Sequence, residues 1–325
     1  MRTNFFIDVK VAGINIHFIS DVEVDICDLR NLFKYHLISN SLSGGIHHCV
    51  EFRTVNHFKV PKDSRLVWEG TYHGVGCKKN HNNKVRKYIS EDGKTEYFVT
   101  TKDAYIIIDL ATGDTVCAMR NKQKQFQSKY VRSTIGAIII LLIHVVMAYH
   151  RRYALHASSV VWREKAIVFT GGSGRGKSTL CSDLVAKGAG FLGDDIVFAY
   201  LENGKVRIAS LLFDAKLFES RKKSKDFIDI IKRHGCEKID SAPLQAIVDT
   251  RKICKGETTV AKEIDEDQLL GVFLTAANNI ALQYDYEDWL TLCACIMEDY
   301  CLYTINFGDR NLLKISILDN FYAPY

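Results

Sequence analysis

One eight-residue run constrains the fold of this chain more than any other feature. It reads Gly171-Gly172-Ser173-Gly174-Arg175-Gly176-Lys177-Ser178 and fits the pattern G-x-x-x-x-G-K-[ST]. The apolar stretch Ala166–Thr170 precedes it, and Leu180, Leu184 and Val185 follow at helical spacing. Glycines let a backbone wrap closely round an anion, and the next helix presents its positive N-terminal end. The run therefore predicts a strand, a phosphate-binding loop and a helix within an α/β domain.

The loop predicts a role for each of its polar groups. Lys177 supplies a mobile charge for the β- and γ-phosphates of a nucleotide, and the Ser178 hydroxyl is the expected Mg²⁺ ligand. Thr179 has two readings, a contact with the α-phosphate or a bond to the helix backbone. Gly188 is expected to end the helix as a C′ glycine. The expected cofactors are ATP and Mg²⁺, and the expected nucleotide-binding residues are Gly172, Ser173, Gly174, Arg175, Gly176, Lys177, Ser178 and Thr179.

Two adjacent carboxylates follow soon after the loop. Asp194 comes 17 positions after Lys177, next to Asp195, with a helix and only a very short apolar step between loop and pair. This compact spacing predicts that both acids lie beside the phosphates. One can hold the metal while the other takes a proton from a hydroxyl, and an extended backbone would make the two side chains diverge. The alternative for such a pair is a solvated turn. His156, upstream of the loop, would by itself be read as structural.

The order of these motifs resembles a known family. Leu155-His156-Ala157, the loop, Lys187-Gly188 and Asp194-Asp195 together are similar to the catalytic domain of HPr kinase/phosphorylase and its relatives. That superfamily also resembles the phosphoenolpyruvate carboxykinases around the nucleotide. The resemblance implies that Asp194 is the base toward a serine hydroxyl, that Asp195 helps bind the metal, and that His156 adjusts the acid. The implied catalytic residues are Asp194, His156 and Lys177, and the implied metal ligands are Ser178 and Asp195.

The resemblance extends from about Ile135 to the C-terminus, and it has limits. Ala242–Val248 and Cys301–Ile305 are similarly placed in the shorter relatives, whereas the glycine-rich, arginine-bearing segment used downstream by true HPr kinases is missing. Phosphorylase activity and HPr as substrate are therefore not implied. Some relatives phosphorylate a serine of a precursor peptide in natural-product pathways. Further phosphate or metal contacts could come from Asp214, Glu219 or Arg251, and their spacing does not choose among them.

The rest of the sequence predicts two domains. Residues 1–130 read as a smaller β-rich domain for recognition or structure, with strands at Glu96–Thr100, Ala104–Leu110 and Thr115–Met119. Residues 131–325 read as the catalytic domain. Its first segment, Ile135–Tyr149, is almost wholly apolar but shorter than the roughly 20 residues of a membrane span, so it predicts a helix buried between the two domains.

Composition and cysteine usage give expectations for the partners and the compartment. The 43 basic residues exceed the 38 acidic ones by only five, too few for the basic footprint of a nucleic-acid-binding protein. Asp8 and Lys10 interrupt the apolar start before it could serve as a signal peptide, so we expect a cytoplasmic protein whose ten cysteines are free thiols. His47, His48 and Cys49 lack a second cluster at zinc-site spacing.

Three functions remain open on the sequence. The leading hypothesis is a kinase that transfers the γ-phosphoryl group of ATP to a serine of a peptide or protein. A second keeps the same site and gives it a small-molecule hydroxyl. A third is a non-catalytic regulatory protein that only senses ATP, and the acidic pair speaks against it because a sensor needs no base. Assembly into homo-oligomers is implied only by the resemblance.

Overall fold

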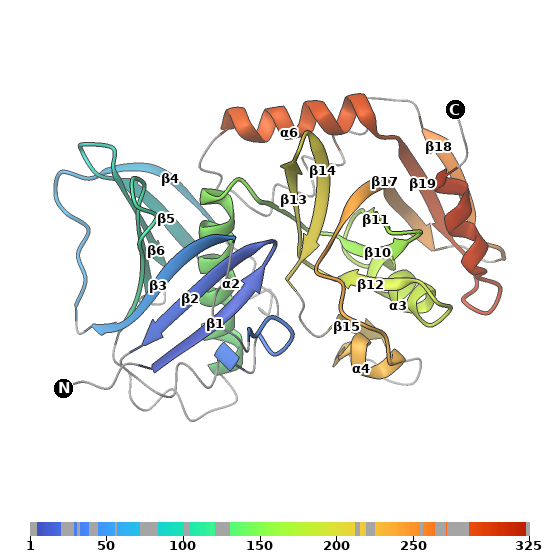
Figure 1. Ribbon diagram of the computed structural model, residues 1–325, viewed down its shortest axis with the longest axis horizontal. Helices are drawn as coiled ribbons and strands as arrows, with labels where there is room; N and C mark the ends of the chain where they lie inside the picture. Colours follow the sequence, from blue (N-terminus) through green and yellow to red (C-terminus); the bar gives the residue numbers. More distant parts are fainter. Residues whose placement is uncertain are drawn as a thin grey trace. The chain divides into compact units, whose positions relative to one another are not determined.

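A computed structural model describes residues 5–20, 29–30, 33–38, 45–55, 57–71, 84–100, 104–120, 131–211, 215–218, 225–253, 256–263, 271 and 286–322. The fold is mixed α/β and dominated by sheets (Figure 1). By contacts, the chain divides into two compact units. The first consists mainly of Met1–His150, and the second of Arg151–Asn279 and Asp285–Tyr325.

The first unit is built on an eight-stranded sheet in the order β1-β2-β3-β8-β7-β6-β5-β4. Its strands are β1 (Phe5–Val11), β2 (Ile14–Ser20), β3 (Ile46–Val55), β4 (Arg65–Thr71), β5 (Lys84–Ile89), β6 (Thr95–Thr100), β7 (Ala104–Asp109) and β8 (Thr115–Arg120). The three strands predicted from the sequence correspond to β6, β7 and β8, which pair as antiparallel neighbours. The β-branched and aromatic content of these segments supported that prediction, because such residues are typical of strands.

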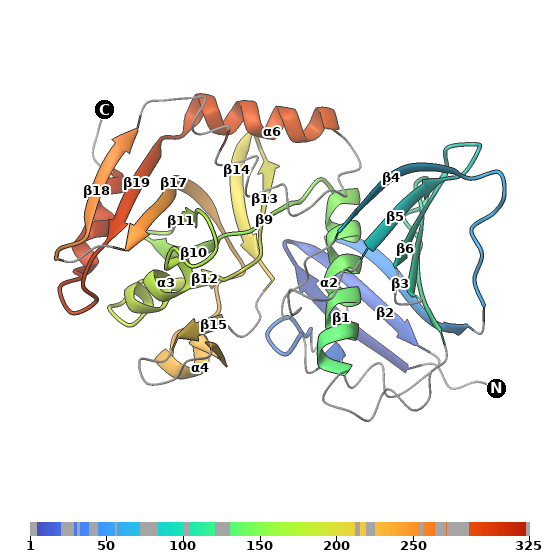
Figure 2. The same cartoon turned by 180° about the vertical axis from the view of Figure 1, so that it is seen from behind.

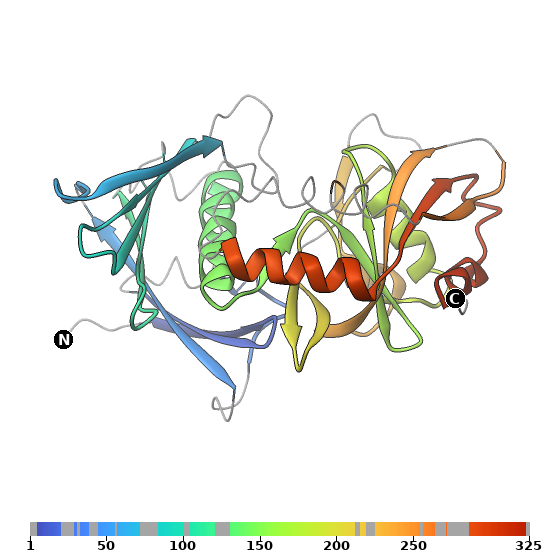
Figure 3. The ribbon, with the colours of Figure 1, turned by 90° about the horizontal axis from the view of Figure 1, so that it is seen from above.

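Helix α2 (Val131–Tyr149) belongs to the first unit and lies against its curved sheet (Figure 3). The side chains of Ile138–Ala148 are all buried, as the apolar run predicted. At its C-terminal end the Tyr149 hydroxyl donates to Leu110 O at 3.4 Å, and the ring packs against Gly113. These contacts group the helix with the preceding strands, whereas the sequence placed it at the start of the catalytic domain. Among the described residues, no helix has the length and apolar character that a membrane crossing requires.

The second unit contains a nine-stranded sheet whose main order is β12-β10-β11-β17-β14-β13-β9, with β19 joining β17 to β18. Its strands are β9 (Tyr153–Leu155), β10 (Ser158–Trp162), β11 (Lys165–Thr170), β12 (Gly190–Gly193), β13 (Val197–Glu202), β14 (Lys205–Ser210), β17 (Ser241–Ile253), β18 (Thr259–Glu263) and β19 (Leu302–Phe307). The other elements are α3 (Lys177–Val185), α4 (Ile230–His234), α6 (Tyr286–Asp299), η1 (Ile315–Tyr322) and the paired strands β15 (Ala215–Phe218) and β16 (Lys225–Ile228). Figure 2 shows α3 beside β10 and β12.

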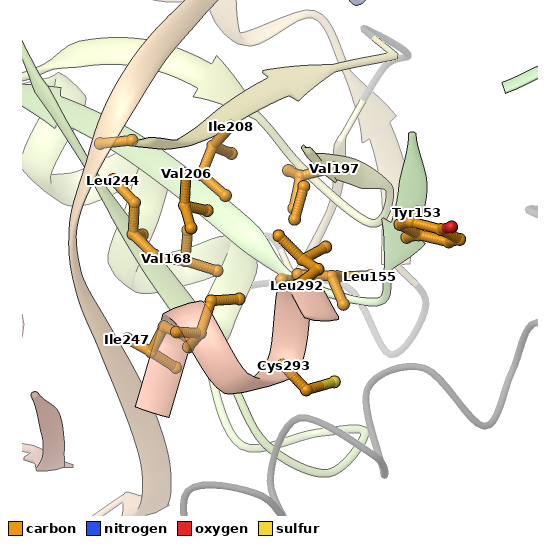
Figure 4. Packing of buried hydrophobic residues seen from close by; sticks show 14 of the residues in the cluster. Tyr153, Leu155, Val168, Val197, Val206, Ile208, Leu244, Ile247, Leu292 and Cys293 are labelled. Carbon is orange, nitrogen blue, oxygen red and sulfur yellow. The ribbon is translucent and has the colours of Figure 1, made fainter. Parts of the chain in front are cut away.

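The core of the second unit lies between this sheet and α6. Trp289, Leu292 and Ile296 of α6 are at most 2% exposed and pack in one cluster with residues of the sheet such as Val168 and Ile247 (Figure 4). The cluster accounts for the apolar spacing along α6, because positions three or four apart share one helix face. It anchors β11, the strand that leads into the predicted loop.

The strand directions bring four chain segments to one edge of this sheet. β11 ends at Thr170, and β17 runs parallel to it, with Asp249 opposite Thr170. β10 runs antiparallel to β11 and so begins at the same edge, where Ser158 pairs with Phe169. β12 is antiparallel to β10 and ends there too, with Gly193 opposite Ser159. The start of β10, the ends of β11 and β12, and Asp249 near the C-terminal end of β17 therefore meet where the glycine-rich run begins.

Candidate active site

The glycine-rich run forms a loop between β11 and α3, as predicted. Gly171, Gly174 and Gly176 have φ of 116°, 83° and 90°, which side chains rarely allow. At Gly171 there is also no room, because a Cβ would lie 2.8 Å from the backbone oxygen of Thr250 and 3.1 Å from an oxygen of Asp249. The first glycine is therefore required both by its own φ and by the closeness of β17.

Helix α3 begins directly at the loop. Its N-cap is Gly176, which has no side chain to accept hydrogen bonds from the first turn. The backbone N–H groups of that turn therefore remain directed at the loop. Lys177 is 7% exposed as a residue, and its ammonium donates to Gly171 O at 2.7 Å, so the side chain folds back over the loop. Gly188, with φ of 109°, ends the helix. The N–H of Gly188 donates to Val185 O and the N–H of Ala189 donates to Leu184 O, and these two hydrogen bonds define a Schellman motif. The predicted C′ glycine is confirmed.

Asp194 is buried against the loop and not solvated in a turn. It is 3% exposed, and the Ser158 hydroxyl at the start of β10 donates to its Oδ1. Burial raises the pKa of Asp194 above its ordinary value, and the neighbouring Asp195 charge raises it too, while hydrogen bonds from Ser158 and Ser178 and the charge of Lys177 act in the opposite direction. Ser178, Lys177 and Asp194 are thus brought together from the loop and the end of β12.

Asp195 points away from its neighbour. Its φ is 71°, and the N–H of Ile196 donates to Asp194 O at 2.9 Å, so Asp195 is the centre of a γ-turn, a strained backbone arrangement. The Asp195 side chain is 35% exposed and lies 3.2 Å from His156 Nε2, measured at Oδ1. The two carboxylates have different partners, Ser158 for Asp194 and His156 for Asp195, and the backbone between them is this turn and not the extended one on which the expected divergence depended. His156 lies two residues before β10, and its partner is Asp195, the second acid of the pair.

Sequence reasoning missed Ser158 and Asp249. Ser158 stood next to the Leu155-His156-Ala157 motif, yet only its register against β11 shows that it faces Asp194. The position of Asp249 beside the loop depends on the parallel pairing of β17 with β11, which the local sequence does not reveal. The remaining predicted nucleotide contacts, Gly172 to Arg175, lie exposed on the loop. Asp214 and Glu219 lie outside the described residues.

The residues present fit a nucleotide with Mg²⁺. Mg²⁺ prefers hard oxygen ligands and is commonly held by one or two carboxylates together with substrate phosphates. Ser178, Asp194 and Asp195 supply such oxygens beside a loop whose exposed glycines leave space for phosphates. No group of three His, Cys, Asp or Glu side chains suited to a metal occurs among the described residues. The described cysteines are all free thiols.

Comparison with known proteins gives a remote structural likeness. No protein-family model matches the chain, and neither does any curated protein sequence. Among solved structures the chain is similar to the Hpr(Ser) kinase/phosphatase from Coxiella burnetii, with 15% identity and a TM-score of 0.29. The match covers 52% of this chain and 93% of that one. At that TM-score, residue roles have to be argued from this chain's own geometry.

Proposed function

We propose that this chain is an ATP- and Mg²⁺-dependent kinase that transfers the γ-phosphoryl group to a hydroxyl, and that the acceptor is a serine of a peptide or protein. The observation that carries the proposal is the buried Asp194 carboxylate, which is held against the loop by Ser178 near the charge of Lys177. Burying a carboxylate is unfavourable, and such groups gather where chemistry needs them. A protein that merely senses ATP could also use Asp194 to hold the metal, but it has no need of a second acid beside it, and here Asp195 lies 3.2 Å from His156.

The contacts of the acidic pair favour a division of labour opposite to the one that the resemblance implies. Asp194 is hydrogen-bonded to Ser178, and in P-loop enzymes the loop serine shares its Mg²⁺ with a nearby aspartate. Asp195 is partly exposed and paired with His156, so an incoming hydroxyl can reach it. We therefore assign Asp194 to the metal, and Asp195, oriented by His156, to the acceptor proton.

The remaining steps follow from the loop. Backbone N–H groups at the start of α3 and the Lys177 ammonium bind the phosphates and offset their charge. Bound Mg²⁺ would offset the negative charge of the β- and γ-phosphate oxygens. Asp195 would accept the proton as the acceptor oxygen attacks, and Ser158 would hold Asp194 in its orientation. Positioning and charge stabilisation account for most of the catalysis in this class of reaction.

Transfer from labelled ATP to serine-containing peptides and to small hydroxyl metabolites tests the proposal. We expect labelled peptide with the unmodified chain, and none with Lys177→Ala. Asp240→Asn is the matched control, because Asp240 is an exposed acid of the same unit. Labelling of metabolites alone would favour the small-molecule kinase. Tight ATP binding without transfer to any acceptor would favour the sensor.

The two aspartates are separated by measuring binding and transfer independently. Asp195→Asn is expected to lose transfer while keeping Mg²⁺-dependent nucleotide binding. Asp194→Asn is expected to raise the Mg²⁺ concentration needed for nucleotide binding. The reverse pattern would return the base role to Asp194, and full activity of both variants would rule out this site.

A further inference from the structure

In the sheet, β17 flanks β11 on the side opposite β10 and β12, and near its C-terminal end it carries a second charged pair. Asp249 stands opposite Thr170, the residue before the loop, and Arg251 follows two positions later, where the register of β17 against β19 shifts between Thr250 and Lys252. Arg251 Nε lies 3.4 Å from Asp249 Oδ2. We propose that Arg251 binds the terminal phosphate of the nucleotide and that Asp249 is its positioning residue. This inference rests on the proposed function, because it concerns the same nucleotide.

Contacts between β17 and the loop place this pair at the phosphate site. An oxygen of Asp249 lies 3.1 Å from the position that a Cβ on Gly171 would take, so its carboxylate reaches the first loop residue. The loop residue Arg175 donates through Nη1 to the backbone oxygen of Arg251. Both residues of the pair are therefore connected to the loop, one at its first glycine and one at its fifth residue.

Charge explains why a carboxylate next to an anion-binding loop needs a partner. Asp249 would repel a polyphosphate unless a cation offset it, and like charges at this range are unfavourable. The cation beside it is Arg251, whose side chain is 43% exposed and can turn toward a ligand while Asp249 is only 19% exposed. A guanidinium presents a planar fork of donors that matches phosphate oxygens in pairs. Direct binding of the metal by Asp249 is the competing use of the carboxylate.

Binding measurements with two magnesium nucleotides, adenylyl imidodiphosphate and ADP, test the proposal without catalysis. Arg251→Ala loses a charge-assisted contact to the terminal phosphate, so it should bind adenylyl imidodiphosphate about tenfold or more weakly than the unmodified chain. Its affinity for ADP should stay within about twofold of that of the unmodified chain. Arg251→Lys should recover only part of this loss, because an ammonium lacks the fork. Asp249→Asn should show a smaller loss in the same direction and an unchanged Mg²⁺ requirement.

Arg53→Ala is the matched control. Arg53 also pairs with an acid two residues away on its strand, with Nε 2.6 Å from Glu51 Oε1, but in the first unit. This variant should bind both nucleotides like the unmodified chain. Melting temperatures of all variants check that they fold, and the exposed Arg251 side chain leaves no cavity when it is shortened.

The outcomes separate this inference from the function on which it rests. Equal effects of Arg251→Ala on both nucleotides, or no effect on either, would overturn it while leaving nucleotide binding intact. The inference would also be overturned if Asp249→Asn needed more Mg²⁺ for nucleotide binding while Arg251→Ala bound both nucleotides like the unmodified chain. That result would identify the Asp249 carboxylate as a metal ligand. If the unmodified chain binds neither nucleotide, the proposed function itself fails.

Discussion

At the scale of single residues, Asp194 combines a structural cost with a functional use. Its pKa is raised mainly by burial, so the folded chain holds the proton more tightly than the unfolded chain does. For an acid this means that stability is lost as pH rises from the ordinary aspartate range through the raised pKa. The charged form present above that range is the form that the fold tolerates least.

We therefore expect Asp194→Asn to stabilise the ligand-free chain at neutral pH. Asparagine keeps an oxygen that can accept from Ser158 and removes the buried charge. Thermal unfolding at pH 7.5 should show a higher melting temperature for the variant, and the difference should vanish in acid below the ordinary aspartate pKa. Asp240→Asn should change neither value, and a destabilised Asp194→Asn at pH 7.5 would contradict the assignment.

His48 in the first unit gives the opposite pH dependence. Its Nε2 lies 2.9 Å from the hydroxyl of Thr115, which itself donates to Gly113 O, so Nε2 carries the proton. Nδ1 then accepts from His150 Nε2 at 3.0 Å, which leaves no place for a second proton. Burial, with a smaller effect of His150, lowers the pKa of His48 from 6.5 to about 3.

This pair predicts acid sensitivity of the first unit. The stability held by neutral His48 is complete above pH 6.5 and is lost as pH falls toward 3, because only the unfolded chain takes up the proton. The loss can reach a few kcal/mol, at roughly 1.4 kcal/mol per pH unit. Urea denaturation at pH 7.5, 5.5 and 4.5 should show this slope, and His48→Gln should flatten it. An identical slope in both proteins would show that His48 does not titrate this way.

Site residues differ in how far the sequence predicted them. Lys177 and Ser178 followed from the loop pattern, since the chemistry of phosphate binding depends on local spacing. Asp194 and Asp195 followed from their closeness in the chain, but their contacts did not, because a γ-turn sets the direction of each. Ser158 and Asp249 reach the site only through strand register, which depends on pairing with residues far along the chain.

At the scale of elements, the loop requires its first glycine for two separate reasons. Gly171→Ala would meet both an unfavourable φ of 116° and a backbone oxygen at 2.8 Å, whereas Gly174→Ala would meet only an unfavourable φ of 83° with no atom within 4 Å. We expect Gly171→Ala to lower the free energy of unfolding by more than the roughly 1 to 3 kcal/mol of backbone strain alone. Gly174→Ala should stay within that range. Chemical denaturation measures both, and equal losses would refute the steric contribution of β17.

Elements were predictable where one periodicity operated over enough residues. Strands β6 to β8 and helix α3 met that condition, and each of the three strands differs from its predicted range by one residue. Strand β10 begins at Ser158, and His156 and Ala157 connect β9 to it. The parallel pairing of β11 with β17 had no local signal, since apolar runs buried on both faces look alike.

At the scale of the whole molecule, the boundary of the second unit can be tested with fragments. All described residues around the loop come from 151–325, so this fragment should bind nucleotide with the affinity of the full chain. The fragment 131–325 adds α2, whose Ile138–Ala148 side chains are buried in the full chain, and should self-associate. Size-exclusion chromatography and nucleotide titration measure the two effects. A monomeric 131–325 fragment together with an unfolded 151–325 fragment would place α2 in the second unit.

The meeting of four strand ends at one sheet edge has a consequence for biogenesis. Ser158, Thr170, Gly193 and Asp249 span much of the second half of the chain, and β17 closes the edge last. During synthesis the loop can emerge long before the strand that supports it, and loop closure over such a distance is slow. A nascent chain therefore gains the complete edge only after residue 249 has been made. Nucleotide arriving at that moment would favour the finished fold by mass action and act as a ligand that assists maturation.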